Sequence, residues 1–574
     1  MARRNLEPWR FLEAYKGEVF SGDWPTIPQM FSITVSRHGD NTAFTRFDPD
    51  ELSLTYKQAE ETVHRTARYL IDKGVSPGDR VAINGHNSPE WALGYLAILY
   101  AGAVVVPLDY QLRDDQLEEL IKFSEVKVLL VDEDRYDTLA THRRSGVKHR
   151  ISLAPSKPAY ILDLERPSKP KDMPDRDLDD LAAILYTSGT TGNHKGVMLT
   201  HRNLVADCYL AQANMNLYSS DVFYALLPIH HSYTMLAVFL EAISVGAEVV
   251  FARRLVVQQI LKELKRGKVT MFLAIPMLFN KMLKGLIRGI REKGKLVYAV
   301  VRTLMLISGG IKKLTGLNPG KKLFKGLLAK LSLDTNRICI CGGGPLPSST
   351  FRMFNQLGID FVQGYGLTET SPILTLNPVD RYKEDSVGKL LPNVHMKILE
   401  PDDRGVGEIA VKGPMVMQGY YKNDDATREA FTEDGWFRTG DLGYLDDEDY
   451  LYLTGRKKSM IVTEGGKNIF PEEIEEQFQL YDEIDQIMVR GYVKDERMKT
   501  EGIEALVHPA YPHFDAQGKE RHREYGPEEI EARINEIIAD VNKRLRPFER
   551  IERVTVLEEP MEMTTTKKIK RFKV

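Results

Sequence analysis

The sequence predicts an α/β protein built mainly from doubly wound parallel sheets, followed by a small α+β domain. Short apolar segments alternate with helical patterns. One example is RVAINGHN (80–87), a helical segment, and then GAVVVPLD (102–109). The same order returns from AEVVFARR (247–254) through a helical segment to VTMFLAIP (269–276). Such β–α–β alternation is typical of parallel strands, because each pair of strands needs a crossover connection.

A change of pattern around TGRKKSM (454–460) predicts the start of the second domain. After this point the chain shows a helix that begins at Pro471, strand-like runs at 484–493 and 501–508, and an amphipathic helix at 527–545. Proline suits the first turn of a helix, and the last segment repeats isoleucines at helical spacing. We therefore expect a large domain of residues 1–456 and a small α+β domain of residues 457–574.

The composition excludes several classes of protein. The chain has 574 residues, 28% of them charged, and a mean hydropathy of −0.31, which excludes a disordered chain and a polytopic membrane protein. Its 78 basic and 81 acidic residues give a net charge of −3, which argues against a nucleic-acid-binding protein. The chain shows neither a secretory signal nor an apolar run of membrane-spanning length, so we expect a cytoplasmic protein.

Three cysteines in so long a chain favour a reducing compartment. Cys339 and Cys341 alternate in an apparent strand, and no second pair of zinc ligands lies near them in the sequence. We interpret Cys208, Cys339 and Cys341 as small core residues.

Residues 281–330 stand apart in charge, with thirteen Lys or Arg and the single acid Glu292. Leu, Ile, Val and Phe are interleaved with these cations, as in KMLKGLIRGI and KLFKGLLAKL. Basic amphipathic helices of this kind bind anionic membrane surfaces. The alternative is a solvated helical insert with a cationic face. The sequence thus leaves open a peripheral contact with the inner membrane surface, and it offers few aromatics for stacking on nucleic acid.

The most specific local signal is LAAILYTSGTTGNHKGV (181–197). An apolar run ends in hydroxyl and glycine residues and is followed by a lysine; the residues are Thr187, Ser188, Gly189, Thr190, Thr191, Gly192 and Lys195. Glycines let backbone N–H groups turn toward an anion, hydroxyls add donors, and lysine adds a charge. The spacing is not that of a Walker A loop, but the chemistry is that of a polyphosphate site.

Further motifs occur along the chain in the same order as in the adenylate-forming superfamily. The chain therefore resembles this superfamily, which includes acyl-CoA synthetases, peptide-synthetase adenylation domains and firefly luciferase. The matching segments are YAGAVVVPLD (100–109), TSGTTGNHKGV (187–197), LPIHHSY (227–233), QGYGLTET (363–370), GEIAVKGPMVMQGYY (407–421), GWFRTGDLG (435–443), TGRKKSMIVTEGGKNIFPEEIE (454–475) and TTTKKIKR (564–571). The resemblance implies a barrel-like β subdomain in the large domain and a small domain that is mobile.

The resemblance also implies an activity. A carboxylic acid reacts with ATP in the presence of Mg²⁺ to give an acyl-adenylate and pyrophosphate, and coenzyme A then accepts the acyl group. Two anions meet in the first step, so cationic groups must neutralise charge in the transition state. The enzyme expected is an AMP-forming acid–thiol ligase.

Roles for individual residues follow from the resemblance. The expected binding and catalytic groups are Glu369 for Mg²⁺, Thr368 for the α-phosphate, Asp441 for the ribose hydroxyls, Arg456 for ribose or phosphate, His231 at the floor of the acyl site, and Gly342, Gly343, Gly344, Pro345, Gln363, Gly364 and Tyr365 around the adenine. Neighbouring histidines do not converge on a metal as i, i+4 histidines do, so His230 and His231 are not expected to form a metal site.

Two further roles concern the second domain. Lys568 is the expected bridge between the substrate carboxylate and the α-phosphate, although Lys567 stands where many members have Gly. Lys458 matches the hinge about which the small domain rotates between the two half-reactions. Gly465 and Gly466 match the loop that approaches the adenylate when the thiol of coenzyme A attacks.

For the acid, the basic segment before the GGGP sequence, GGKNIFPEEIE and LPIHHSY resemble the corresponding parts of long-chain fatty acyl-CoA synthetases, and this resemblance implies a medium- to long-chain fatty acid. Small apolar residues after Tyr233 (Thr234, Met235, Ala237 and Val238) permit an acyl tunnel. The alternatives are a fatty acyl-AMP ligase that loads a carrier protein, a ligase for a short or aromatic acid, a luciferase-like monooxygenase, and a non-catalytic membrane-binding scaffold.

Overall fold

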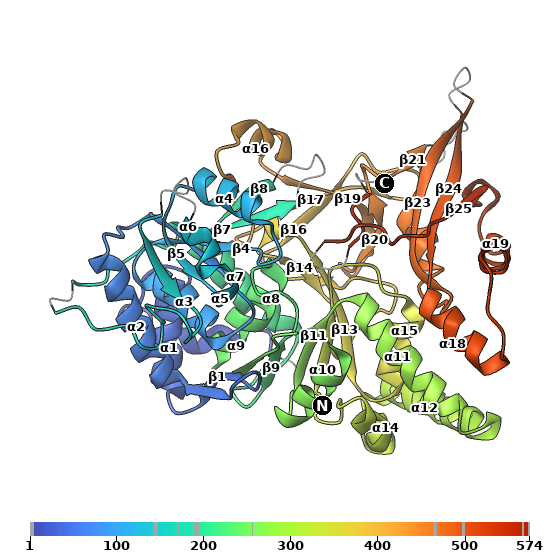
Figure 1. The fold of residues 1–574 in the computed structure, drawn as a ribbon, viewed down its shortest axis with the longest axis horizontal. Helices are drawn as coiled ribbons and strands as arrows, with labels where there is room; N and C mark the ends of the chain where they lie inside the picture. Colours follow the sequence, from blue (N-terminus) through green and yellow to red (C-terminus); the bar gives the residue numbers. More distant parts are fainter. Residues whose placement is uncertain are drawn as a thin grey trace.

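A computed structural model describes residues 5–141, 147–168, 171–188, 194–254, 256–462, 468–495, 500–564 and 568–571. Two large sheets, each with a parallel centre, form most of the molecule, and a smaller sheet near the C-terminus lies on the opposite side from α1, α2 and α3 (Figure 1). The α/β class predicted from the sequence is confirmed. In the described part of the chain, no helix combines the length and the apolar character needed to cross a membrane.

The larger sheet has nine strands. In spatial order they are β15 (Lys389–Leu390), β14 (Ile373–Leu376), β13 (Asp360–Gly366), β12 (Ile338–Cys341), β11 (Met271–Ala274), β9 (Val222–Ala225), β10 (Glu248–Phe251), β1 (Thr42–Arg46) and β2 (Leu52–Thr55). The six strands from β13 to β1 are parallel, and the antiparallel strands lie at the two edges.

The second sheet has seven strands. They are β18 (Gly419–Tyr420), β8 (His194–Thr200), β7 (Leu181–Ser188), β4 (Val104–Leu108), β3 (Arg80–Asn84), β5 (Val126–Val131) and β6 (His149–Ser152). The strands from β7 to β6 are parallel. The predicted unit at 80–109 is β3, α3 (Pro89–Tyr100) and β4. Every residue of α3 is buried, as expected for a helix that is apolar on all sides.

The main hydrophobic core joins both sheets. It contains Val81 and Val105 of the seven-stranded sheet and Phe44 and Val249 of the nine-stranded sheet. The helices in contact with one another here are α1 (Ile27–His38), α2 (Tyr56–Asp72), α3, α7 (His201–Ala211) and α9 (Glu241–Val245). The helices α1, α2 and α7 each begin after a threonine whose hydroxyl accepts from the backbone N–H three residues later, a capping box. Cys208, Cys339 and Cys341 are buried free thiols, as predicted.

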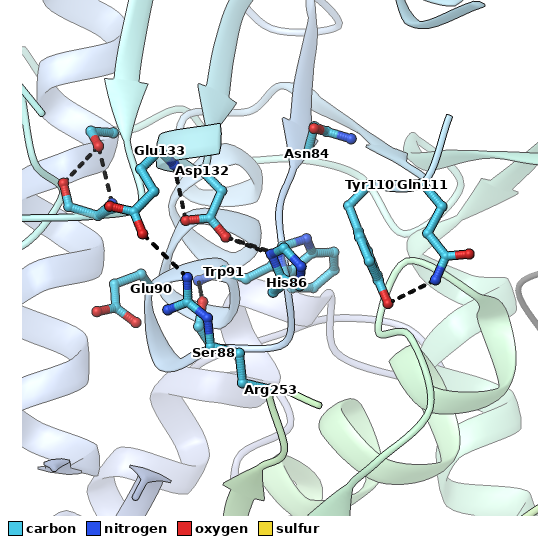
Figure 2. A network of polar contacts seen from close by, with 12 residues as sticks. Asn84, His86, Ser88, Glu90, Trp91, Tyr110, Gln111, Asp132, Glu133 and Arg253 are labelled. Carbon is cyan, nitrogen blue, oxygen red and sulfur yellow. Dashed lines mark hydrogen bonds and ion pairs between the residues drawn. The ribbon is translucent and has the colours of Figure 1, made fainter. Parts of the chain in front are cut away.

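A polar network holds the two sheets together at the ends of their strands (Figure 2). His86, after β3, lies 3.0 Å from the Asp132 carboxylate, after β5. Arg253, after β10, donates to Glu133 at 3.5 Å. Asn87 donates to the carbonyl oxygens of Ala225 and Leu227 and accepts from the N–H of Ile229. This network fixes the segment that leads into the LPIHHSY motif.

The remaining strands form smaller sheets. An antiparallel sheet contains β16 (His395–Leu399), β17 (Gly407–Lys412), β19 (Phe437–Leu445) and β20 (Leu451–Arg456); a hairpin contains β21 (Ile461–Val462) and β22 (Asn468–Ile469); and the C-terminal sheet contains β23 (Ile484–Asp495), β24 (Thr500–Pro509) and β25 (Arg553–Val556). The subdomain expected to resemble a barrel is therefore, in the described residues, an open four-stranded sheet, because β16 and β20 do not pair with each other.

The C-terminal part has its own hydrophobic core, which includes Val489, Val507 and Ile534. Its helices are α17 (Pro471–Glu476), α18 (Tyr511–Arg521) and α19 (Pro527–Asn542). The predicted helix at Pro471, the two strands and the amphipathic helix are all present. The strand β20 ends at Arg456, where the sequence places the domain boundary; the division into two domains stays a prediction.

The basic segment 281–330 lies within a helical insert between β11 and β12. Its helices are α11 (Pro276–Arg291), α12 (Lys295–Thr315), α13 (Gly320–Leu323) and α14 (Lys325–Lys330). The other α-helices of the described residues are α4 (Asp114–Phe123), α5 (Glu133–Tyr136), α6 (Thr138–Thr141), α8 (Ser232–Thr234), α10 (Val257–Arg266), α15 (Ser348–Gln356) and α16 (Asp424–Ala430).

Candidate active site

A cavity of about 920 Å³ lies where strands of both large sheets end and where the C-terminal segment returns to them. Residues that follow β4, β12 and β13 line it, together with Arg456, Lys568 and Lys570. In open α/β sheets, ligands bind outside the carboxyl ends of the strands. The cavity is therefore the candidate active site.

The predicted phosphate loop connects β7 and β8, which pair so that Thr187 lies opposite Lys195. Both residues line the cavity. Gly189, Thr190, Thr191 and Gly192 lie outside the described residues, as does the side chain of Ser188. The described ends of the hairpin thus bring one hydroxyl and one ammonium group to the cavity wall.

Glu369 belongs to a chain of contacts that starts at Lys195. The Lys195 ammonium lies 4.7 Å from the centre of the Tyr420 ring, and the Tyr420 hydroxyl donates to Glu369 Oε1 at 2.9 Å. Burial and the charge of Glu369 raise the pKa of Tyr420, so the phenol stays protonated and keeps donating. Thr368 lies beside Glu369, and its hydroxyl is 3.1 Å from that of Ser232.

These oxygens fit a magnesium site. Mg²⁺ prefers hard oxygen ligands and is usually held by one or two carboxylates together with substrate phosphates. Glu369 supplies one carboxylate at the cavity wall, and the Lys195 side of the wall suits phosphate. The sequence did not predict that Tyr420 contacts Glu369. Tyr420 lies near the end of the GEIAVKGPMVMQGYY motif, on the strand β18, which pairs with β8.

Asp441 and Arg456 lie opposite each other on β19 and β20. Arg456 Nε is 2.9 Å from Asp441 Oδ1, and the Tyr365 hydroxyl donates to Asp441 Oδ2 at 2.7 Å. Asp441 is only 6% exposed, and burial together with its charge raises the pKa of Tyr365. Arg456 and Tyr365 therefore both contact the carboxylate of Asp441, and the family resemblance assigns all three residues to the same nucleotide.

Four of the seven residues predicted to surround the adenine line the cavity, and adenine binding by them stays a prediction. Gly342, Gly343, Gly364 and Tyr365 line the cavity, whereas Gly344, Pro345 and Gln363 lie outside its lining. Gly343 has a φ of +82°, a left-handed conformation that glycine adopts without strain.

Lys568 lines the cavity near Arg456 and Asp441. Its backbone N–H donates to the Thr564 hydroxyl at 3.1 Å, and its carbonyl accepts from the Thr564 N–H at 2.8 Å. Arg571 holds the end of the described chain by donating both to Glu475 and to the Val489 carbonyl. Desolvation and the charge of Arg456 lower the pKa of Lys568 to about 8. Lys567, the other candidate, lies outside the described residues.

His231 lies next to His230 and close to Asp109, which follows β4. His230 Nε2 is 3.5 Å from Asp109 Oδ1, and one possible ligand atom from each of the three residues lies within 4.8 Å of the others. Burial, together with the charges of His230 and Lys568, lowers the pKa of His231 to about 3, so its ring is neutral. Sequence reasoning did not single out Asp109, although it closes the YAGAVVVPLD motif at the carboxyl end of a parallel strand.

The acyl-tunnel residues expected after Tyr233 are only partly correct. Of Thr234, Met235, Ala237 and Val238, only Ala237 lines the cavity; Tyr233 and Glu241 line it with Ala237. Tyr233, Ala237 and Glu241 are spaced four residues apart, so they share the face of this helical segment that meets the cavity, whereas Thr234, Met235 and Val238 lie on other faces. Lys458 also lines the cavity, and Gly465 and Gly466 lie outside the described residues, so the hinge stays a prediction.

Comparisons with known proteins bear on this geometry. The family described as AMP-binding enzyme matches residues 31–421. Long-chain-fatty-acid–CoA ligase ACSBG2 of Xenopus laevis is 28% identical over 79% of this chain, which spans 65% of that protein, just under two thirds. Feruloyl-CoA synthase of an Amycolatopsis species is 30% identical over 85% of this chain and 88% of its own length.

The solved structure of ATP-bound MatB from Rhodopseudomonas palustris superposes with a TM-score of 0.74 at 25% identity, over 95% of this chain and 97% of that chain. The fold is thus that of the expected superfamily. The chain belongs to the AMP-binding enzymes, and the predicted enzyme class, an AMP-forming acid–thiol ligase, is confirmed at the level of the family.

Proposed function

We propose that this protein activates a medium- to long-chain fatty acid with ATP and Mg²⁺, and then transfers the acyl group to coenzyme A. The observation that carries the proposal is one cavity lined by Lys568, Arg456, Glu369 and Tyr420, in which Arg456 pairs with the buried carboxylate of Asp441. These groups supply a cation for the reacting anions, an anchor for the nucleotide and a carboxylate for a divalent cation.

In the first half-reaction, a carboxylate oxygen of the acid forms a bond to the α-phosphorus, and the bond from that phosphorus to the bridging oxygen of pyrophosphate breaks. The electron pair leaves with pyrophosphate. Lys568 offsets the negative charge that gathers between carboxylate and phosphate, while Asp441 holds the ribose in line. When bound at Glu369, Mg²⁺ would neutralise the charge of the departing pyrophosphate.

In the second half-reaction, the thiol sulfur attacks the acyl carbon, the bond from that carbon to the AMP oxygen breaks with its electron pair leaving on AMP, and the thiol proton passes to solvent water. The neutral His231 ring lies at the cavity wall, with His230 and Asp109 beside it. A neutral imidazole can orient the acyl carbonyl without adding a charge that would hold the leaving AMP.

The proposed acid follows from the lining of the cavity. Beyond Tyr233, apolar side chains of Met215, Leu227, Ile373 and Leu376 line the cavity, which favours an alkyl chain. A ligase for a short or aromatic acid and an acyl-AMP ligase that serves a carrier protein are the competing proposals.

The direct test measures AMP and pyrophosphate release for acids from acetate to oleate, with and without coenzyme A. The proposal predicts thioester formation that needs coenzyme A and peaks at longer chains. Adenylate that forms but does not respond to coenzyme A would indicate a carrier-protein ligase. A peak at short or aromatic acids would overturn the fatty-acid assignment and keep the chemistry.

The helical insert gives a second, separate proposal: peripheral contact with an anionic membrane. On α12, Leu296, Val300, Ile307, Ile311 and Leu314 recur at helical spacing and are all exposed, Leu314 to 87%. The opposite face of α12, with Met305 and Ser308, is buried against the protein. An exposed aliphatic stripe of this kind marks an interaction surface.

Charge indicates which partner this stripe accepts. Most of the flanking cations are exposed; they are Lys281, Arg288, Arg291, Lys293, Lys295, Lys313, Lys322, Lys325 and Lys330. Lys312 is an exception, since it is buried and paired with Asp360. A second copy of the same cationic face would be repelled, whereas anionic lipid attracts cations and takes up the aliphatic side chains.

Sedimentation with phosphatidylcholine vesicles, with or without phosphatidylglycerol, tests this contact. The protein is expected to bind only the anionic vesicles, and the double variant Ile307→Ser/Leu314→Ser to bind at least about tenfold more weakly, since each side chain loses apolar burial. Val256→Ser is the matched control, because Val256 is as exposed as Ile307 but lies outside the insert. Equal binding by the double variant and the control would contradict the proposal.

A further inference from the structure

The inner end of the cavity carries an acidic residue among apolar ones. Tyr233, Ala237 and Glu241 line the cavity from one face of the helical segment that starts at α8 and ends in α9. At the α-helical rise of about 1.5 Å per residue, the eight residues from Tyr233 to Glu241 would span roughly 12 Å, and the wider π-helical turn between them shortens this distance. Tyr233 follows directly on the segment that contains His231, near which the acid's carboxylate is expected to lie. Glu241 therefore belongs to the far end of the acyl site.

Glu241 is fully buried, and neither of its carboxyl oxygens has a hydrogen-bond partner among the described residues. Asp207, on α7, is also fully buried and acts on Glu241 electrostatically. Asp207 Oδ2 accepts from the N–H of Ile373 at 2.9 Å, while its Oδ1 has no partner in the described part of the chain. Burial raises the pKa of both residues well above the usual range and so favours the protonated, neutral form of each carboxyl group.

Two neutral buried carboxyl groups are costly when their hydrogen-bonding capacity is unused. A plain alkyl tail that reached Glu241 would leave the carboxyl group without a partner and would shut out water. A tail that ends in an oxygen would satisfy it, because a protonated carboxyl group both donates through O–H and accepts through its carbonyl oxygen. The apolar residues Met215, Leu227 and Leu376 suit the chain before that oxygen.

We infer that the acid substrate carries a hydroxyl group at the end remote from its carboxylate, and that Glu241 binds this hydroxyl. The inference rests on the proposed ligase function and narrows its substrate class from fatty acids to hydroxylated ones. A site built to hydrogen-bond a substrate hydroxyl discriminates strongly against the analogue that lacks it.

The experiment compares kcat/KM for pyrophosphate release with ω-hydroxy fatty acids and with unsubstituted acids of the same chain lengths. The wild-type protein should favour the hydroxy acid by at least about tenfold at the length that reaches Glu241. Glu241→Leu should reverse the preference, and Glu241→Gln, which keeps a donor and an acceptor in nearly the same shape, should preserve it.

Ser244→Ala is the matched control, because Ser244 is equally buried on α9 and does not line the cavity. This variant can lower stability but should leave the ratio between the two acids unchanged. A wild-type preference for unsubstituted acids at every length would overturn the inference and leave the ligase proposal intact; ordered water would then satisfy Glu241. If none of the acids in either series supports pyrophosphate release, both the inference about the hydroxyl group and the proposed ligase function are overturned.

Discussion

Lys568→Ala is expected to slow acyl-adenylate formation by about 100- to 1,000-fold, the usual effect of removing one transition-state charge contact. Two anions react in this step, and Lys568 lines the cavity beside Arg456 and Asp441. Thioester formation from supplied acyl-adenylate should change by less than about threefold, because the phosphoryl bond is then already made. Single-turnover assays of each half-reaction measure the two effects separately.

Lys570→Ala is the matched control. Lys570 also lines the cavity, but its ammonium lies 3.5 Å from Glu562. We expect this variant to keep adenylation within about threefold of the wild-type rate. Full adenylation activity in Lys568→Ala would show that another group, such as Lys567, bridges the reacting anions.

The same residue predicts a pH dependence. The pKa of Lys568 is lowered to about 8, and the ammonium is the form that offsets the negative charge. The kcat/KM for adenylation should therefore be high below pH 8 and fall as the pH rises through that value. In Lys568→Arg this alkaline limb should disappear, since a guanidinium stays protonated over the whole range. If the alkaline fall of kcat/KM is unchanged in Lys568→Arg, a group other than Lys568 causes it.

The fold was predictable from the sequence where local pattern and packing agree. The unit of β3, α3 and β4 consists mostly of apolar runs bounded by turn residues, so run length and turns identify it without knowledge of its neighbours. The C-terminal helices and strands follow from isoleucine spacing and a helix-starting proline in the same way. The four-stranded sheet was harder, because whether its edges close depends on pairing between distant strands.

The site divides along similar lines. Motif resemblance identified Asp441, Arg456 and Tyr365, and the structure brings them into contact. The motif resemblance did not identify Tyr420 or Asp109, because their positions at the site depend on which strands lie side by side. Glu241 was missed for another reason: the segment that carries it is almost entirely apolar and buried, so hydrophobic periodicity does not report which of its faces meets the cavity.

Asp441→Ala should lower kcat/KM for ATP by about 100- to 1,000-fold, because hydrogen bonds to a buried charge are each worth about 1.5–3 kcal/mol. Asp441 accepts from Tyr365 and pairs with Arg456, and its loss would leave both without this partner. Tyr365→Phe removes the first of these contacts alone and should cost less than about tenfold. Asp441→Asn keeps a hydrogen-bond acceptor, so its kcat/KM for ATP should lie between the values of Asp441→Ala and Tyr365→Phe.

A loss of activity alone would not separate ribose binding from damage to the site, so the decisive comparison uses 2′-deoxy-ATP. The wild-type protein should discriminate against it by about tenfold or more, since one hydrogen bond to a buried carboxylate is lost. Asp441→Ala has no carboxylate to lose, so it should use ATP and 2′-deoxy-ATP almost equally. If the variant keeps the wild-type discrimination, another residue recognises the ribose, and Asp441 acts only by positioning Tyr365 and Arg456.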